Sequence, residues 1–222
     1  MGNKSMNQQI ILLGFVVFSL LLVACGSDNS SNGDMGSSSS GCTNTYGTNT
    51  VTDCRDGITY KTVLIGTQTW MAENLKYVVD SSWCYMNSAD SCAKYGRLYS
   101  WDAAMAECPD EWHLPNLQEW LTLSHYVDAN NGDEGIGMSL KSLTGWYNDG
   151  NGTDRFGFSA LPASRRYNNG SFYDASVSTH FWSATENDSE VASYLILVYS
   201  SEGMIGGGYT KNGGFSVRCL KD

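Results

Sequence analysis

Acidic side chains in loop-like segments are the residues of this sequence that could support hydrolysis. The candidates are Asp149, Asp154, Glu186 and Asp188, because two carboxylates that flank a bond can act as general acid and general base. Their spacing selects no pair, and acids on a solvated loop account for the same residues. We therefore predict no catalytic residues and a protein that is not an enzyme.

Two loops rich in Asp, Asn and Gly offer oxygen ligands of the kind that calcium prefers, at residues 128–134 and 148–154. The candidate ligands are Asp149, Asn151 and Asp154. Neither loop has Gly at the sixth position of an EF-hand, and ordinary Asn-Gly and Asp-Gly turns explain the same composition. We predict no cofactor, with calcium at these three residues as the alternative.

Aromatic side chains suggest a binding chemistry. The chain has 7 Trp and 13 Tyr, and exposed rings of both types stack on the faces of sugars. The ligand-binding candidates lie in Gly-, Asn- and Ser-rich surroundings and are Trp83, Trp146, Tyr147, Tyr167 and Tyr173. The alternative is that these rings pin long loops to the domain. We assign the remaining tryptophans to the core. They are Trp70, Trp101, Trp112, Trp120 and Trp182.

The first 24 residues predict a lipoprotein signal peptide. Lys4 precedes an apolar run over residues 10–24, and small residues stand before Cys25, as in a bacterial lipobox. The alternatives are an ordinary cleavage site with a chance cysteine, or a transmembrane anchor, for which the run is short. We predict lipidation at Cys25 and attachment to a membrane through the acyl chains.

Residues 25–44 are rich in Ser, Gly and Asn and predict a flexible, lipidated tether ahead of one folded domain over residues 45–222. This layout predicts a lipid-anchored protein of the bacterial cell envelope. Gly26 and Ser27 lack the aspartate that retains some lipoproteins at the inner membrane, so we favour the outer membrane. The net charge of −10 without a Lys/Arg cluster argues against a nucleic-acid partner.

Six cysteines remain after Cys25, and an even number in an exported chain favours disulfides over metal thiolates. Six cysteines allow fifteen pairings, and spacing alone does not choose among them. The set that we expect is Cys42–Cys54, Cys84–Cys92 and Cys108–Cys219. The three histidines are scattered and there is no CxxC, so a zinc site is not expected.

Local patterns indicate the elements that must position these residues. Alternation predicts a β-hairpin over residues 59–71 with a turn at Gly66 and Thr67. Ser100 and Asn116 are N-cap residues for two helices, over residues 101–108 and from residue 117 onward. Further strand candidates are residues 157–161, 180–184, 192–199, 204–209 and 214–220. Two short helices, short antiparallel strands and long glycine-rich loops predict an α+β fold.

Seven blocks in fixed order resemble the Fibrobacter succinogenes major paralogous domain family. These blocks are residues 56–63, 68–75, 95–101, 112–115, 157–162, 181–186 and 214–219. The family is similar to the C-type-lectin-like fold and, more distantly, to the formylglycine-generating sulfatase-modifying group, which has a stretch like that at residues 114–120. The resemblance implies a disulfide-stapled, C-type-lectin-like domain in which Cys108 pairs with Cys219.

The resemblance implies little about activity. The sulfatase-modifying enzymes use a close pair of copper-binding cysteines near the C-terminus, and this chain has only Cys219 there. We therefore predict a non-catalytic surface module that binds glycans or plant-fibre surfaces. The alternatives are a module that binds other envelope proteins or has a structural role, and an enzyme of unknown activity.

Overall fold

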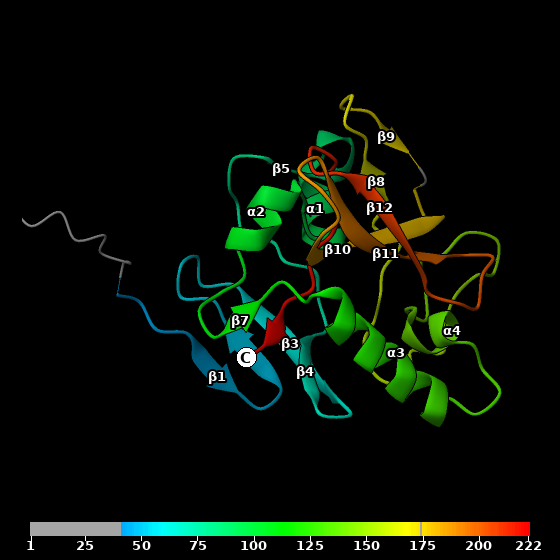
Figure 1. Ribbon diagram of the computed structural model, residues 1–222. Coiled ribbons are helices and arrows are strands. Elements are labelled where there is room, and N and C mark those ends of the chain that lie inside the picture. The colour runs from blue at the N-terminus through cyan, green and yellow to red at the C-terminus, as the bar shows by residue number, and fades with distance from the viewer. Residues whose placement is uncertain (1–40, 174) are drawn as a thin grey trace, which may run out of the picture. The chain divides into compact units, whose positions relative to one another are not determined.

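The structure is a computed structural model that describes residues 41–173 and 175–222 (Figure 1). The predicted signal peptide at 1–24, the lipidation site Cys25 and tether residues 26–40 lie outside the described residues. Within the described part, no helix has both the length and the apolar character needed to cross a bilayer.

Four α-helices and one 3-10 helix occur among the described residues. The helices are η1 (Tyr85–Asn87), α1 (Ala89–Tyr95), α2 (Trp101–Ala106), α3 (Leu117–Asn130) and α4 (Ile136–Leu140). The strands are β1 (Thr45–Gly47), β2 (Thr50–Thr52), β3 (Thr59–Ile65), β4 (Gln68–Met71), β5 (Ser82–Trp83), β6 (Leu98–Tyr99), β7 (Trp112–His113), β8 (Arg165–Arg166), β9 (Phe172–Tyr173), β10 (Ser178–Glu186), β11 (Val191–Val198), β12 (Ile205–Thr210) and β13 (Leu220–Lys221).

The strands form antiparallel sheets, so the predicted α+β class is confirmed. One sheet has the order β1-β2-β3-β4-β13-β7, which places the last strand of the chain between β4 and β7 (Figure 1). A second sheet has the order β10-β11-β12, and β5-β6 and β8-β9 are separate short pairs. The C-terminal strand β13 thus pairs with strands from the first half of the sequence.

The elements with clear local signals form where the sequence predicts them. β3 and β4 make the expected hairpin, whose turn places Gly66 at a φ of 63°. The Ser100 side chain accepts a hydrogen bond from the Ala103 N–H at the start of α2. Asn116 and Glu119 form a reciprocal capping box at the start of α3.

Three predictions about elements are wrong. The prediction of two helices omits α1 and α4, which have only seven and five residues and so carry little periodicity. Residues 157–161 form no strand. Residues 214–220 are regular strand only from Leu220, because the extended segment before it makes isolated bridges to several partners, including Tyr99 and Phe181.

All three expected disulfides are present, and their connectivity is as predicted: Cys42–Cys54, Cys84–Cys92 and Cys108–Cys219. Ordered contacts also begin ahead of the expected boundary at residue 45. The buried Asn44 donates its side-chain N–H to the Asp110 carbonyl and accepts the Cys54 N–H. Residues 42–44 therefore belong to the folded domain and not to the tether.

The buried side chains form two apolar clusters that share the C-terminal segment. One contains Trp101, Trp182 and Phe215, and the other contains Trp70, Trp120 and Leu220. Trp182 stacks on Phe215 with 4.2 Å between ring centroids, and Trp70 packs on Trp120 at 4.7 Å. The five tryptophans assigned to the core are all at most 9% exposed, so this prediction is confirmed.

Candidate functional site

An open groove of about 640 Å³ surrounds Trp83, one of the predicted ligand-binding residues. We call it the Trp83 groove. Its lining residues are Val79, Asp80, Ser81, Trp83, Ser100, Asp102, Ala103, Ala106, Glu107, Arg166, Asn168 and Asn212. They come from the segment around β5, from α2, from the end of β8 and from the turn that follows β12. The groove is therefore assembled from segments far apart in the sequence.

Backbone hydrogen bonds hold these segments together. The Ser100 N–H donates to the Ser81 carbonyl at 2.9 Å, and the Trp101 N–H donates to the Lys211 carbonyl at 2.9 Å. Arg166 and Gly214 exchange two hydrogen bonds of 2.8 Å. A Cβ atom at Gly214 would lie 3.2 Å from the Trp83 ring and 2.9 Å from the Arg166 Cβ, so this close approach requires glycine.

Two arginines fix the wall of the groove at Trp83. The Arg166 guanidinium lies over the Trp83 ring, 3.9 Å from its centroid, which is a cation–π contact. Arg97 donates to the Oγ and to the carbonyl oxygen of Ser82, each at 2.8 Å, and so holds β5 in place. The Cys84–Cys92 disulfide follows directly. The partly buried indole is thus held in one orientation before any ligand arrives.

The polar groups of the groove are mainly acids and amides. Asp80 and Asp102 are exposed, and Glu107 forms a salt bridge with Arg55 at 3.3 Å. Asn168 and Asn212 are also exposed and can both donate and accept hydrogen bonds. No described residue accepts the Trp83 indole N–H. A flat ring, an N–H with no acceptor in the described part of the chain, and several amide and carboxylate oxygens suit a ligand rich in hydroxyl groups.

The family model of the Fibrobacter succinogenes major domain matches residues 63–221. This chain belongs to that family. The matched range contains every residue that lines the Trp83 groove, so the groove lies wholly within the major domain. Neither the comparison with curated proteins nor that with solved structures finds a match.

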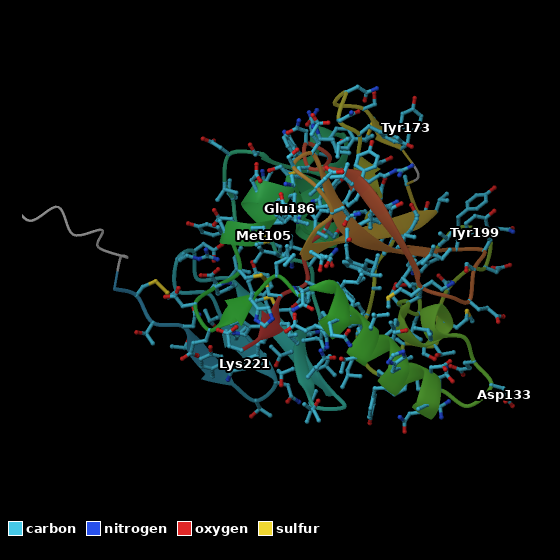
Figure 2. The ribbon with its side chains drawn as sticks, in the orientation of Figure 1. Met105, Asp133, Tyr173, Glu186, Tyr199 and Lys221 are labelled. Atoms are coloured by element: carbon cyan, nitrogen blue, oxygen red, sulfur yellow. A yellow bond between two sulfur atoms is a disulfide. The ribbon has the colours of Figure 1, made fainter. Side chains whose placement is uncertain are left out.

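Tyr167 and Tyr173 lie together on the β8–β9 hairpin of the major domain. Their rings meet edge to face with centroids 5.1 Å apart, and Tyr209 packs on Tyr167 at 6.4 Å. Tyr173 is 57% exposed and projects at the edge of the domain (Figure 2). Neither tyrosine lines the Trp83 groove, although the neighbours of Tyr167 in the chain, Arg166 and Asn168, do.

The adjacent candidates Trp146 and Tyr147 have opposite environments. Tyr147 is 57% exposed and packs edge to face on Tyr199 with 5.4 Å between ring centroids. Tyr199 lies at an edge of the domain away from Tyr173 (Figure 2). Trp146 is only 5% exposed, and its indole N–H lies 3.1 Å from both the Ser142 Oγ and the Ala160 carbonyl oxygen. The expectation that Trp146 is exposed for a ligand is wrong, because its indole is a buried anchor of the loop.

The calcium candidates have roles inside their own loop. The Asn151 Oδ1 accepts the Trp146 N–H, and the two carboxylate oxygens of Asp154 accept the Ser159 N–H and Oγ–H. Asp149 is exposed and has a φ of 57°. Among the described residues, no three His, Cys, Asp or Glu side chains gather as a metal site would require.

His180 packs in a buried aromatic layer with Phe215 and Tyr194. Its ring centroid is 5.0 Å from that of Phe215 and 5.4 Å from that of Tyr194. Burial, reinforced by the nearby charge of Arg165, lowers the pKa of His180 to about 3. The imidazole is therefore neutral at physiological pH and packs as one more flat ring.

Sequence reasoning found one wall of the groove and missed the rest. Trp83 was a candidate because it is an aromatic residue in a polar segment. Asp80, Asn168 and Asn212 had no such signal, since Asp and Asn in loops are commonplace. Asp102 lies in the first turn of α2, where an acidic residue is equally commonplace. The pairing of β5 with β6, of Trp101 with Lys211 and of Arg166 with Gly214 brings them to one surface.

Proposed function

We propose that this protein is a cell-surface lipoprotein whose major domain binds polysaccharide without catalysis, through the Trp83 groove. The observation that carries the proposal is the groove itself. The indole of Trp83 lies under the Arg166 guanidinium and beside exposed Asn and Asp side chains in an open cavity of about 640 Å³, and its N–H has no acceptor among the described residues. A cavity of this size accommodates one or more sugar units.

The openness of the groove to solvent supports a glycan over an apolar ligand. Sugars present many hydroxyl groups and one or two apolar ring faces. Asn168, Asn212 and Asp102 match the hydroxyl groups, and the indole matches a ring face or edge. We further propose that the α+β domain is a C-type-lectin-like fold with a distant relation to the sulfatase-modifying group, and that the lipobox at Cys25 anchors it in the outer membrane.

Retention on insoluble polysaccharide tests this function. The purified full chain, kept in detergent, is mixed with cellulose, xylan and cell-wall material, and the bound fraction is measured. We expect retention on at least one material. Substituting Trp83→Ala or Asn212→Ala should weaken retention, by about tenfold for the tryptophan, because about 1.4 kcal/mol of ring contact is lost.

Tyr147→Ala provides the control, since it removes an aromatic ring that is accessible to solvent but lies outside the groove. It should bind like the parent chain. Equal retention of the Trp83→Ala and parent chains, or no retention on any material, contradicts glycan binding in the groove. In that case a recurrent protein neighbour in crosslinking on intact cells would support the alternative of an envelope interaction module.

A further inference from the structure

A second, smaller cavity lies on a different part of the folded domain, and several basic residues line it. We call it the Arg218 pocket. Its volume is about 150 Å³, and its lining residues are Lys61, Ala72, Glu73, Asn74, Lys76, Lys94, Tyr95, Gly96, Ser142, Ser159, Leu161 and Arg218. Four of these residues are cationic and one is acidic. This balance is the reverse of that of the whole chain, whose net charge is −10.

Arg218 is buried in the wall of this pocket without a carboxylate partner among the described residues. It is 1% exposed. Its Nε donates to the Asn74 Oδ1 at 2.6 Å, its Nη1 to the Met71 and Phe158 carbonyls, and its Nη2 to the Ser159 carbonyl at 3.1 Å. A guanidinium has five N–H donors. In the described part of the chain, no group accepts the second N–H of Nη2.

The acids near Arg218 are engaged elsewhere. The Glu73 carboxylate lies 3.3 Å from the Lys76 Nζ and accepts the Lys61 N–H, while Asp154 accepts both hydrogen bonds from Ser159. Burial lowers the pKa of Arg218 to about 9, so the guanidinium stays protonated at neutral pH. Its positive charge is therefore only partly compensated, and charge buried in this way favours a nearby anion.

Lysines that line the Arg218 pocket add to its positive electrostatic potential. Lys61 and Lys94 are exposed, and neither has a salt bridge with a described acid. The Lys94 Nζ lies 4.7 Å from the centroid of the Tyr95 ring, at the pocket wall. Flexible ammonium groups around a fixed, buried guanidinium are the usual means of recognising a carboxylate, sulfate or phosphate group.

We propose that the Arg218 pocket is a binding site for a small oxyanion, a carboxylate or sulfate group, separate from the glycan groove. A volume of about 150 Å³ is roughly ten times what one ordered water needs, so the pocket admits the charged group of a ligand but not a polymer chain. The oxyanion contacts the second N–H of the Arg218 Nη2 and the ammonium groups of Lys61 and Lys94. It comes either from an acidic sugar unit or from an inorganic salt.

Titration calorimetry on the purified full chain in detergent tests this site with three probes: sodium galacturonate, sodium sulfate and neutral galactose. We expect one or both anions to bind with a dissociation constant of about 1 mM or lower, and added salt to weaken them. Tighter binding of galacturonate assigns the source to an acidic sugar, and tighter binding of sulfate assigns it to an inorganic anion. Binding of neither anion, or equal binding of galactose, overturns the proposal.

The double variant K61Q/K94Q removes two exposed ammonium groups that make no hydrogen bond to a described residue, so it should remain folded. It should weaken anion binding at least about fivefold. The control K221Q/R155Q removes the same charge from outside the pocket and should bind as the parent does. Unchanged affinity in K61Q/K94Q overturns the proposed site. Because these readouts do not involve polysaccharide retention, failure here leaves the proposed function of the Trp83 groove unaffected.

Discussion

The Trp83 groove and the Arg218 pocket differ in size, charge and construction. The groove is open, has a volume of about 640 Å³ and is lined by three acids and one arginine. The pocket has a volume of about 150 Å³ and is lined by four cations and one acid. The groove combines loop residues with residues of β5, α2 and β8, whereas the pocket is built against a guanidinium inside the core.

This difference shows that the net charge of the whole chain does not determine the local charge of a binding site. A handful of side chains within a Debye length of about 10 Å decides the local potential, and distant surface acids are screened. The composition of the chain argues against binding to large anionic polymers. It does not argue against binding a single small anion in a pocket whose nearby acids are already paired.

The largest expected effect is a loss of unfolding free energy, and it should differ between the two disulfides that adjoin the cavities. Cys219 follows Arg218, and its bond to Cys108 spans 111 residues, while the bond of Cys84 to Cys92 follows Trp83 and spans eight. On the chain-entropy model, loss of the first costs about 5 kcal/mol of unfolding free energy and loss of the second about 2.5 kcal/mol.

Urea unfolding of the double variants C108A/C219A and C84A/C92A measures this contrast directly. The parent chain under the same oxidising conditions is the reference. Equal destabilisation by the two variants would contradict the view that the C-terminal segment is the main staple of the domain.

Arg218→Met should be the next largest perturbation, with a loss of about 3–5 kcal/mol, because three carbonyls and Asn74 lose a charged donor. Lys141→Met provides the comparison. Lys141 is also buried, and burial lowers its pKa, but its Nζ contacts carbonyl oxygens only at 3.3–3.4 Å. We expect its loss to cost about 1–2 kcal/mol by chemical unfolding. If Lys141→Met lowers the free energy of unfolding as much as Arg218→Met does, then Arg218 contributes no more to stability than another buried cation.

Acidification should lower the free energy of unfolding through His180, which packs in the aromatic layer with Phe215. Its pKa is about 3 in the folded chain, below the unfolded value of about 6.5, so the unfolded chain binds the proton more readily. Stability is therefore fully present above about pH 6.5 and is lost as pH falls toward 3. The loss should reach about 1.4 kcal/mol near pH 5.5.

Thermal or urea unfolding between about pH 7.5 and 5.5 measures how steeply the free energy of unfolding falls with pH, which is the slope that His180 should produce. His180→Phe should flatten it, since phenylalanine keeps a flat ring in the same layer and does not titrate. His125→Gln, at an exposed position, should leave it unchanged. A slope that survives His180→Phe would assign the acid sensitivity to another group.

His113 should make a smaller contribution to the pH dependence of the free energy of unfolding, with the opposite sign to that of His180. Partial burial disfavours its protonation, but hydrogen bonds to Asp222 and Glu119 outweigh this and raise its pKa. Its contribution is thus present below about pH 6.5 and is lost as pH rises through the raised pKa. Because the side chain is 37% exposed, we expect no more than about 0.5 kcal/mol. Comparison of His113→Gln with the parent between about pH 6 and 8 measures it, and a stability gain with rising pH would contradict the assignment.

The elements that the sequence predicted correctly share one property: their signals are local. The turn at Gly66 and the caps at Ser100 and Asn116 depend on residues within four positions, so reading the chain in order is sufficient. The disulfide pattern followed from the resemblance to a family and from short spacings. The helices α1 and α4 were missed because helices of seven and five residues show too little periodicity.

The candidate site was predicted less well, for a physical reason visible in the adjacent pair Trp146 and Tyr147. Both lie in the same polar loop, yet one is 5% exposed and the other 57%. Which of two neighbouring rings turns inward depends on acceptors elsewhere, here Ser142 and Ala160. No local pattern encodes that choice.

By itself, the sequence determined the fold class, the family, the main hairpin, the two capped helices and the predicted export signals, because each depends on short-range spacing or on an ordered series of blocks. Only the tertiary structure decided the sites. It brought Trp83, Asp102, Arg166 and Asn212 to one groove and buried Arg218 beside three lysines. Burial and electrostatics act between groups that are close in space, and the folding of the chain, not its order, sets those distances.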